Sequence, residues 1–427
     1  MVYLPHWPIP STLGKREIDY ETVFERASIV LEKLGNPHQK LTNVIHVAGT
    51  NGKGSAVSLL AQIFSCAGKK VHIYTSPHLH DCNERIVLAG EKISDKFLYE
   101  VMEEVRLAAG KTPLTFMEAF SIGAFLAFSK VPADITIIEC GLGGRIDITN
   151  IIEKKLATLI MPISFDHTEY LGNSIERIAL EKAMIMRPQT PLIVASQPQA
   201  AKNIIKILAT DQNIESYFYD EDFSVMMDEE SGDFDFEFDQ IFFESLPKPA
   251  LLGEHQYINF ATAIAAATIL KIDEAAIRQA ISKVTWPSRI EKIENGLKKF
   301  LPNNESEIWI DGAHNAGGAF ALARWILQQD EAKKNYVICG FSRGKCKKEF
   351  LEKFKNIAEV LAVRVNGEPY PEDPKIISEI GNELGMNIAA FSDLDEALKY
   401  INESCRVIIC GSLHLARDVR RLGGFSM

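Results

Sequence analysis

The chain has 427 residues, of which 46% are hydrophobic and 24% are charged, the balance of an ordinary soluble globular protein. Its formal net charge of −11 argues against a nucleic-acid partner, which usually binds to a basic face. The length suggests two or three domains, and the apolar runs are too short to span a membrane.

Cysteine usage and the N-terminal stretch predict a cellular compartment. The seven cysteines are spread along the chain, their number is odd, and they form no Cys-x-x-Cys pair. This pattern favours a reducing compartment over a disulfide framework or a zinc site. Residues 1–20 have no basic segment followed by an apolar core, so no signal peptide is expected. We therefore expect a cytoplasmic protein that does not bind membranes.

Strands alternate with helices over the first part of the chain. Runs of apolar and β-branched residues predict buried strands at residues 43–49, 70–76, 134–140 and 156–164. Helical patterns occupy residues 55–67, where Gly68 ends the helix, and residues 115–129. Such alternation predicts a parallel sheet that is covered by helices. The acidic, Phe-rich segment 220–246 instead predicts antiparallel hairpin strands with one buried face.

A second set of strands follows a break in the pattern near residues 286–307. The new strands are predicted at residues 308–312, 336–340, 360–365 and 406–412, with helical stretches between them. The sequence thus predicts an α/β protein with two domains. A P-loop-type parallel-sheet domain occupies residues 1–289, and a smaller Rossmann-like α/β domain occupies residues 290–427.

A glycine-rich loop follows the first predicted strand and leads into a helix. It reads "HVAGTNGKGS". We expect its last seven residues to bind ATP: Gly49, Thr50, Asn51, Gly52, Lys53, Gly54 and Ser55. The glycines let backbone N–H groups point at phosphate oxygens, and Lys53 supplies a positive charge. The usual motif places the hydroxyl directly after Gly-Lys, whereas here Gly54 intervenes. A turn that binds no ligand is the structural alternative.

Four further motifs identify a family. They are "TSPHLHDCNERI" at 75–86, "IIECGLGGRIDITN" at 137–150, "SFDHTEYLG" at 164–172 and "WIDGAHNAGG" at 309–318. With the glycine-rich loop, these motifs resemble the folylpolyglutamate synthase and dihydrofolate synthase family, which is related to the Mur peptide ligases. The resemblance runs from residue 34 to residue 420.

The resemblance implies an ATP-dependent ligase of folate biosynthesis and one-carbon metabolism. In this chemistry the γ-phosphoryl group of ATP converts a carboxylate into an acyl phosphate, which the amine of L-glutamate then attacks. The implied small-molecule substrates are dihydropteroate, reduced folates and L-glutamate. We expect one bifunctional enzyme that carries out the dihydrofolate synthase and folylpolyglutamate synthase reactions, and a monomer.

The resemblance also assigns a metal site and a modified lysine. Ser76, Glu139 and His167 are implied as ligands of two Mg²⁺ ions, and a monovalent cation is a further expected cofactor. Lys182 is implied to be carbamylated, which would make it a metal-binding carboxylate. Catalysis is assigned to Lys53, Lys182 and His167. Without the resemblance, Glu139 could cap a loop, His167 could be a hydrogen-bonded loop residue, and Lys182 could be a solvated helix lysine.

The remaining implied contacts are with nucleotide and pterin. The resemblance places Asn259, Arg289, Asp311 and His314 against ATP. The pterin contacts are implied for Thr115, Phe116, Met117, Glu118, Ile146, Asp147 and Ile148.

Some residues depart from the family pattern. Ala56 replaces Thr or Ser, Met184 and Ser288 replace Gly, and Ala316 replaces Pro. The segment 340–349 lacks the family's usual Lys-Asp pattern, and Lys345 is the residue that could serve in its place. Two alternatives remain open at this point. One is a Mur-type ligase that acts on a nucleotide-linked muramyl peptide, and the other is a degenerate nucleotide-binding protein without ligase activity.

Overall fold

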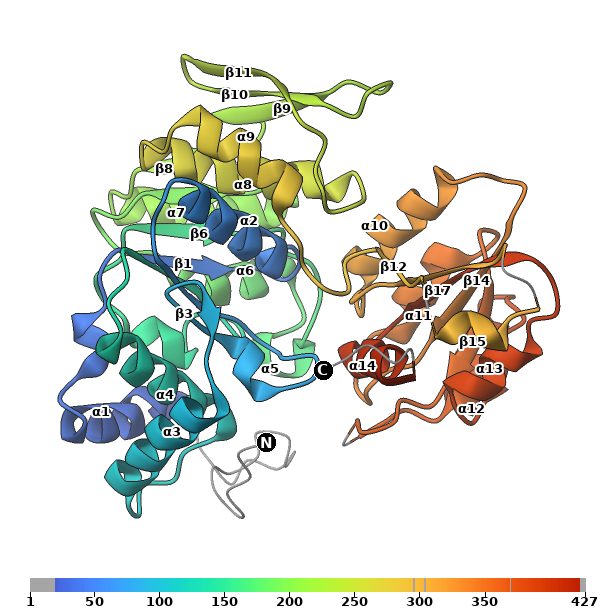
Figure 1. Ribbon diagram of the computed structural model, residues 1–427, viewed down its shortest axis with the longest axis horizontal. Helices are drawn as coiled ribbons and strands as arrows, with labels where there is room; N and C mark the ends of the chain where they lie inside the picture. The colour runs from blue at the N-terminus through green and yellow to red at the C-terminus, as the bar shows by residue number, and fades with distance from the viewer. Residues whose placement is uncertain (1–19, 295, 303–304, 369, 423–427) are drawn as a thin grey trace. The chain divides into compact units, whose positions relative to one another are not determined.

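The computed structural model describes residues 20–294, 296–302, 305–368 and 370–422, in two compact units (Figure 1). The N-terminal unit comprises the residues up to Ile163, Asn173–Ala250 and Tyr257–Val284. The C-terminal unit comprises Ser164–Gly172, Leu251–Gln256 and the residues from Thr285 on. The domain boundary between residues 289 and 290 stays a prediction. The stretch 1–19, where no signal peptide is expected, lies outside the described residues.

An eight-stranded sheet with the order β4-β3-β2-β5-β1-β6-β7-β8 forms the centre of the N-terminal unit. Six strands are parallel: β1 (Val44–Ala48), β2 (Val71–Tyr74), β5 (Ile135–Glu139), β6 (Ala157–Ile160), β7 (Leu192–Val194) and β8 (Ser216–Phe218). The hairpin strands β3 (Ile86–Leu88) and β4 (Glu91–Lys92) add an antiparallel edge. The predicted parallel sheet is confirmed, and it places the ends of β1, β2 and β5 next to one another.

Helices cover both faces of this sheet. They are α1 (Val23–Lys33), α2 (Lys53–Cys66), α3 (Asp95–Ala109), α4 (Phe116–Lys130), α6 (Ile175–Ala183), α7 (Gln199–Asp211), α8 (His255–Ile269) and α9 (Glu274–Lys283), with short 3-10 helices η1 (Tyr20–Thr22), η2 (Pro37–Lys40), η3 (Cys82–Arg85) and η4 (Ile148–Ile151). Every residue of β1 and β5 is buried, as expected for parallel strands between two helical layers. Helix α4 begins at a capping box, in which Thr115 and Glu118 satisfy each other's backbone N–H groups.

A small antiparallel sheet is added to the N-terminal unit. It consists of β9 (Phe223–Met227), β10 (Phe234–Phe238) and β11 (Ile241–Leu246), in the order β11-β10-β9. Phe234, Phe236 and Phe238 are buried, whereas the side chain of Glu237 between them is exposed. This alternation confirms the predicted hairpin strands with one buried face.

The C-terminal unit is built on a six-stranded sheet with the order β12-β13-β17-β14-β15-β16. The strands are β12 (Glu291–Lys292), β13 (Glu307–Ile310), β14 (Lys334–Cys339), β15 (Glu359–Val363), β16 (Ala389–Phe391) and β17 (Cys405–Cys410), and all neighbours except β12 and β13 pair in parallel. The helices are α5 (Thr168–Leu171), α10 (Ala316–Leu327), α11 (Lys347–Leu351), α12 (Pro374–Glu383), α13 (Leu394–Tyr400) and α14 (Leu413–Leu422), with η5 (Leu297–Phe300) and η6 (Glu352–Phe354).

This second sheet is also covered on both faces. Along β14, Val337 and Cys339 join one hydrophobic cluster, while Tyr336 and Ile338 join another. Because successive side chains of a strand point to opposite faces, the two clusters lie on the two sides of the sheet. The structure therefore confirms the predicted second α/β fold.

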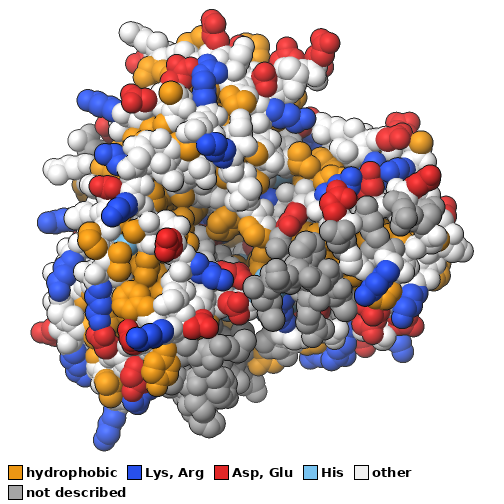
Figure 2. Space-filling view, viewed as in Figure 1, with side chains coloured by type: hydrophobic (Ala, Val, Ile, Leu, Met, Phe, Trp, Pro, Cys, Tyr) orange, Lys and Arg blue, Asp and Glu red, His pale blue; other side chains and the backbone are white. Residues whose placement is uncertain are grey.

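The surface carries charges of both signs. Figure 2 shows Lys and Arg side chains interspersed with Asp and Glu side chains on the visible face. Among the helices of the described ranges, none is long and apolar enough to cross a membrane.

Candidate active site

The glycine-rich loop joins β1 to α2, as predicted. Helix α2 begins at Lys53, so its first backbone N–H groups lack partners within the helix and can bind an anion. Gly52 has φ +79°, and a Cβ atom there would collide with the side-chain amide of Asn259 from α8. Only glycine fits both constraints, and the loop therefore packs directly against the residue predicted to contact the nucleotide.

Ser55 presents a buried hydroxyl without a partner. Its residue is 1% exposed, and its Oγ atom has no hydrogen-bond partner among the described residues. Leaving a buried hydroxyl unpaired costs about 1–3 kcal/mol. A site that receives a phosphate oxygen or a metal ion would satisfy it. Ser55, which stands one residue later than the hydroxyl of the usual motif, lies in the first turn of α2, where the phosphate site is predicted.

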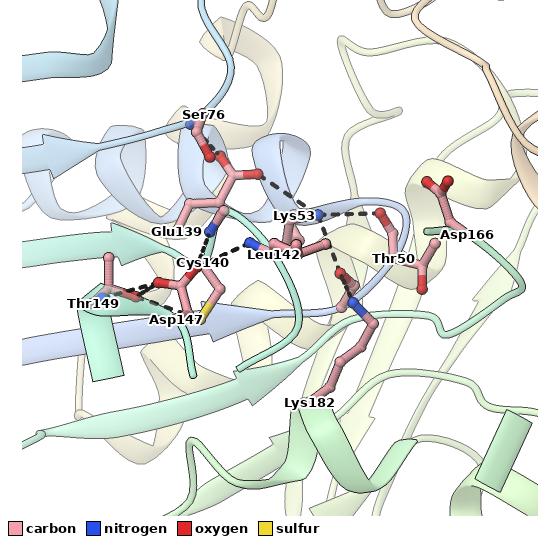
Figure 3. A network of polar contacts seen from close by, with 12 residues as sticks. Thr50, Lys53, Ser76, Glu139, Cys140, Leu142, Asp147, Thr149, Asp166 and Lys182 are labelled. Atoms are coloured by element: carbon pink, nitrogen blue, oxygen red, sulfur yellow. Dashed lines mark hydrogen bonds and ion pairs between the residues drawn. The ribbon is translucent and has the colours of Figure 1, made fainter. Parts of the chain in front are cut away.

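Two lysines meet at one carbonyl oxygen of the loop (Figure 3). Lys53 Nζ donates to Gly49 O and Thr50 O, at 3.1 Å each. Lys182 Nζ, from α6, donates to the same Gly49 O at 3.0 Å. Both side chains are largely buried. Two ammonium groups on one acceptor form a strongly positive centre at the start of α2.

Glu139 supplies the negative charge next to this centre. It ends β5, is 4% exposed, and lies with its Oε1 atom 3.9 Å from Lys53 Nζ. Its Oε2 atom accepts a hydrogen bond of 3.3 Å from the backbone N–H of Ser76, just beyond β2 (Figure 3). The parallel register thus brings Lys53, Glu139 and Ser76 together from three neighbouring segments.

The loop after β5 is closed by Asp147. Its Oδ2 atom accepts hydrogen bonds of 2.9 Å from the backbone N–H groups of Gly141 and Leu142. Its Oδ1 atom accepts from the N–H and the hydroxyl of Thr149. The carboxylate thus has four donors from its own loop. This arrangement fixes the loop beside Glu139, and the predicted contact of Asp147 with a pterin stays a prediction.

Buried polar side chains lie behind this loop. His46 Nε2 is 3.0 Å from Cys140 Sγ and 2.9 Å from Thr149 Oγ1. Burial, reinforced by the charges of Lys155 and Arg187, holds the pKa of His46 well below its ordinary value. His46 is therefore neutral at physiological pH and acts as a structural link between β1 and the loop.

The segments predicted to contact a pterin come close to each other. Phe116, Ile146 and Ile148 contribute to one hydrophobic cluster, and Met117 and Asp147 both flank Gly141. Glu118, however, receives hydrogen bonds from Arg26 and from Thr115 N–H and is 2% exposed. Its carboxylate stabilises the start of α4.

In the C-terminal unit, the Asp166 carboxylate accepts hydrogen bonds from three side chains and from the backbone N–H of His167. His314 Nε2 lies 3.0 Å and Asn315 Nδ2 3.2 Å from its Oδ2 atom, and Lys345 Nζ donates to its Oδ1 atom. Burial raises the pKa of the Asp166 carboxyl, but the hydrogen bond from His314 and the charges of His314, His167 and Lys345 outweigh it and hold that pKa well below its usual range. Asp166 was not among the site residues predicted from the sequence, although it directly precedes His167.

His167 follows Asp166 at the start of α5, with φ +49°. Its Nε2 atom lies 3.9 Å from Asp166 Oδ2, and its side chain is 40% exposed. His167 belongs to the C-terminal unit, whereas Ser76, Glu139 and Lys182 belong to the N-terminal unit. The described residues contain no group of three or more His, Cys, Asp or Glu that could hold a metal ion. The expected ligand set includes only one carboxylate and one imidazole before any modification of Lys182.

Asp311 organises the turn after β13. It accepts hydrogen bonds of 2.9 Å from Ile290 N–H and 2.7 Å from Ala313 N–H. Burial raises the pKa of its carboxyl, an effect that the charge of Arg289 opposes. Arg289 packs closely on Gly312, where a Cβ atom would lie 2.5 Å from Arg289 Nη1. Arg289, Asp311 and His314 thus share one small region of the C-terminal unit.

The structure explains the departures from the family pattern to different degrees. Ser288 has φ +57°, a conformation in which glycine would be unstrained, and its buried hydroxyl has no hydrogen-bond partner among the described residues. Ala316 is the first residue of α10, where proline is favoured but alanine also fits. Met184 is the C-cap of α6, and Ala56 is fully buried in α2.

Family models match both halves of the chain. The Mur ligase middle domain model matches residues 47–267, and the model for the C-terminal domain of dihydrofolate synthetase matches residues 298–422. The first match contains the glycine-rich loop, Glu139 and Lys182. The second contains Asp311, His314 and Lys345.

Full-length relatives agree with these models. The chain is 30% identical to the dihydrofolate synthase/folylpolyglutamate synthase of Bacillus subtilis, over 96% of each chain. Its structure is similar to that of E. coli FolC in complex with DHPP and ADP, with a TM-score of 0.82, 28% identity, and coverage of 93% of this chain and 92% of the other. A bifunctional folylpolyglutamate synthase/dihydrofolate synthase with bound Mn, AMPPNP and L-glutamate gives a TM-score of 0.82 at 26% identity, covering 93% of each chain. The chain therefore belongs to the dihydrofolate synthase/folylpolyglutamate synthase family.

Proposed function

We propose that this protein is a bifunctional Mg-ATP-dependent ligase that joins L-glutamate to dihydropteroate and to reduced folates. The observation that carries the proposal is the meeting of Lys53 and Lys182 at Gly49 O, beside Glu139 and the unpaired hydroxyl of Ser55. Cations, one carboxylate and an unsatisfied hydroxyl at a helix start suit a metal-bound triphosphate. Membership of a family whose relatives carry both activities in their names supports the two reactions.

The glycine-rich loop binds the phosphates of ATP in this proposal. Backbone N–H groups at the start of α2 receive phosphate oxygens, Lys53 neutralises them, and Ser55 completes the site. The residues assigned to ATP are those from Gly49 to Ser55, with Asn259 from α8 and with Arg289, Asp311 and His314 from the C-terminal unit. Asn259 fits this role because its amide packs on Gly52.

A metal site is proposed although the described residues bring no three His, Cys, Asp or Glu side chains together. Ser76, Glu139 and His167 are the proposed Mg²⁺ ligands, and the unpaired Ser55 hydroxyl is the observation that favours a bound ion or phosphate there. When bound, the ions neutralise charge on the transferring phosphoryl group. Two Mg²⁺ ions are proposed, and a monovalent cation is a further proposal.

Lys182 is proposed to be carbamylated. As an ammonium group, Lys182 shares Gly49 O with Lys53, which places two positive groups at one acceptor. Loss of a proton to solvent gives the neutral amine, whose nitrogen adds to carbon dioxide and releases a second proton, so that a carbamate carboxylate forms. The repulsion then becomes an attraction to Lys53 and to the metal ions, and the buried position of Lys182 protects the product from water.

The substrates react in two steps. The carboxylate of the folate substrate takes the γ-phosphoryl group, and the resulting acyl phosphate is attacked by the amine of glutamate, with release of phosphate. The pterin is proposed to contact the segments Thr115 to Glu118 and Ile146 to Ile148, where Phe116 offers an aromatic face. We also propose a cytoplasmic monomer that acts on small molecules and binds no nucleic acid.

ADP release tests the proposed function. The purified protein would be given Mg-ATP and glutamate with dihydropteroate, with tetrahydrofolate or with a nucleotide-linked muramyl peptide, and each product would be identified by mass spectrometry. Release with both folates, each product heavier by one glutamyl unit, is the expected result. Release with one folate alone would contradict the bifunctional assignment, and release with the muramyl peptide alone would contradict the folate assignment.

A further inference from the structure

Arg85 is a buried arginine that the roles proposed above do not use. It ends the 3-10 helix η3, and 5% of its surface is exposed. Its Nε atom donates to His78 Nδ1 at 2.8 Å, and its Nη1 atom faces the sulfur of Met117 at 3.2 Å. The guanidinium carbon lies 5.2 Å from the ring centroid of Phe116. The guanidinium is thus packed on the residues proposed to contact the pterin.

Among the residues that the structure describes, no carboxylate pairs with this charge. Within the described ranges, no acidic side chain lies within ion-pair distance of Arg85, and the nearby acids have other partners. Glu118 pairs with Arg26. Asp147 accepts hydrogen bonds from backbone N–H groups of its own loop. Glu84 accepts hydrogen bonds from the N–H groups of Leu79 and His80. A thioether sulfur is a weak acceptor. Burying an uncompensated charge costs several kcal/mol, so proteins keep such an arginine where an anion completes it.

The position of Arg85 points to the reacting end of the substrate. The carbonyl oxygen of Arg85 accepts a hydrogen bond of 3.0 Å from Thr75 N–H, and the next residue is the proposed metal ligand Ser76. Gly141 is close to both segments: a Cβ atom added to it would lie 2.9 Å from Met117 Cε and 3.4 Å from Ser76 Oγ. The side chain of Met117 therefore touches the guanidinium with its sulfur and lies with its methyl group on the Gly141 loop, near Ser76.

We propose that Arg85 binds the carboxylate of the folate substrate, the group that receives the phosphoryl group. A guanidinium can hold both carboxylate oxygens at once, and the flexible Met117 side chain can move aside to admit them. The carboxylate must approach a triphosphate of like charge, so a cation on the substrate side lowers the repulsion before phosphoryl transfer. Arg85 is a substrate-binding residue in this inference, which rests on the proposed function.

Removing the carboxylate from the ligand tests this contact. Binding of dihydropteroate, and of its analogue with a hydrogen atom in place of the carboxyl group, would be measured by calorimetry with Mg²⁺ and AMPPNP so that no turnover occurs. The proteins would be the wild type, Arg85→Gln, Arg85→Lys and the control Arg106→Gln. Arg106 lies on the surface of α3, where it pairs with Glu103.

The inference predicts an effect that depends on the carboxylate. Arg85→Gln should weaken dihydropteroate binding about 30-fold or more and leave the analogue unaffected, since a truncated buried charge pair costs 2 kcal/mol or more. Arg85→Lys keeps the charge but loses the paired N–H donors of the guanidinium, so its affinity for dihydropteroate should lie between those of the wild type and Arg85→Gln. Arg106→Gln should bind dihydropteroate as tightly as the wild type. Equal weakening of both ligands by Arg85→Gln would overturn the inference, since it would show a packing role. Failure of the wild type to bind dihydropteroate would overturn the proposed function together with it.

Discussion

The N-terminal and C-terminal units both concentrate charge at the ends of their parallel strands, but they balance it in opposite ways. Near the glycine-rich loop, Lys53 and Lys182 donate to backbone carbonyls, and one carboxylate, Glu139, lies 3.9 Å from Lys53. In the C-terminal unit, the single carboxylate of Asp166 receives His314, Asn315 and Lys345. Among these described contacts of the first region, two ammonium groups share a carbonyl oxygen near one carboxylate, which suits an anionic ligand. In the second region, the donors bond directly to the carboxylate, which holds their side chains in place.

The largest expected effect comes from the cation-rich region. Lys182→Ala should lower turnover by about 10³-fold or more, because it removes the proposed metal-binding carbamate. ADP release measures the rate, and thermal unfolding checks that the fold is kept. The exposed Lys283→Ala on α9 is the control and should retain full activity. Near wild-type turnover in Lys182→Ala would refute the carbamate, as would the absence of a carbamate signal in carbon-13 NMR of protein equilibrated with labelled bicarbonate.

Asp166 provides the matching test in the C-terminal unit. Asp166→Asn keeps the shape but loses the charge that compensates His314 and Lys345, so the protein should lose about 2 kcal/mol of stability at neutral pH. Chemical denaturation measures this loss. Glu169→Gln, an exposed change in the short helix α5 that follows Asp166, should alter the stability by less than about 0.5 kcal/mol. Equal stabilities of Asp166→Asn and the wild type would show that the three donors need no carboxylate.

Two serines of α2 separate ligand binding from stability. Ser55→Ala should raise the KM for ATP about tenfold and also stabilise the protein by up to about 1 kcal/mol, because its buried hydroxyl is unpaired without a ligand. Ser58→Ala should instead destabilise the protein, since Ser58 Oγ donates to Ser55 O at 2.9 Å. Its loss should cost about 1 kcal/mol and leave the KM for ATP unchanged. Equal changes of stability and of the KM for ATP in the two variants would contradict the assignment of Ser55 to the ATP site.

The smallest effect concerns acid sensitivity near Arg289. Burial, together with the charge of Arg289, lowers the pKa of His255 from 6.5 to about 4. The unfolded chain thus binds a proton more readily than the folded protein between these values, so stability falls as the pH falls. His255→Gln should remove about 1 kcal/mol of the loss that the wild type suffers between pH 7 and about pH 5.5. Denaturation curves at both pH values measure it, and parallel losses in the two proteins would contradict the assignment.

The sequence predicted the regions that local patterns encode. The strand, glycine-rich loop and helix around Lys53 follow from a run of buried residues and a helix start, and they appear in the structure with boundaries shifted by a few residues. The two α/β folds were predicted for the same reason. The alternation of Phe with acidic residues likewise predicted β9 to β11.

Contacts between distant residues could not be predicted in this way. Asp166 meets His314 and Lys345, which lie far along the chain, and no periodicity encodes that meeting. Among the described residues, the Ser55 hydroxyl has no partner and Arg85 has no carboxylate within ion-pair distance, and both facts depend on all the neighbours that the fold brings together. The family motif marked His167, whereas Asp166 beside it became apparent only through its three side-chain donors.

The packing of Asn259 on Gly52 has a consequence for the order in which the protein is completed. The glycine-rich loop is made early in synthesis, yet the amide that fills the space beside it belongs to a helix made much later. A ribosome-bound chain that ends before α8 thus carries the whole loop sequence without its support. The nucleotide site matures late, and a truncated product that ends before residue 259 lacks a finished one.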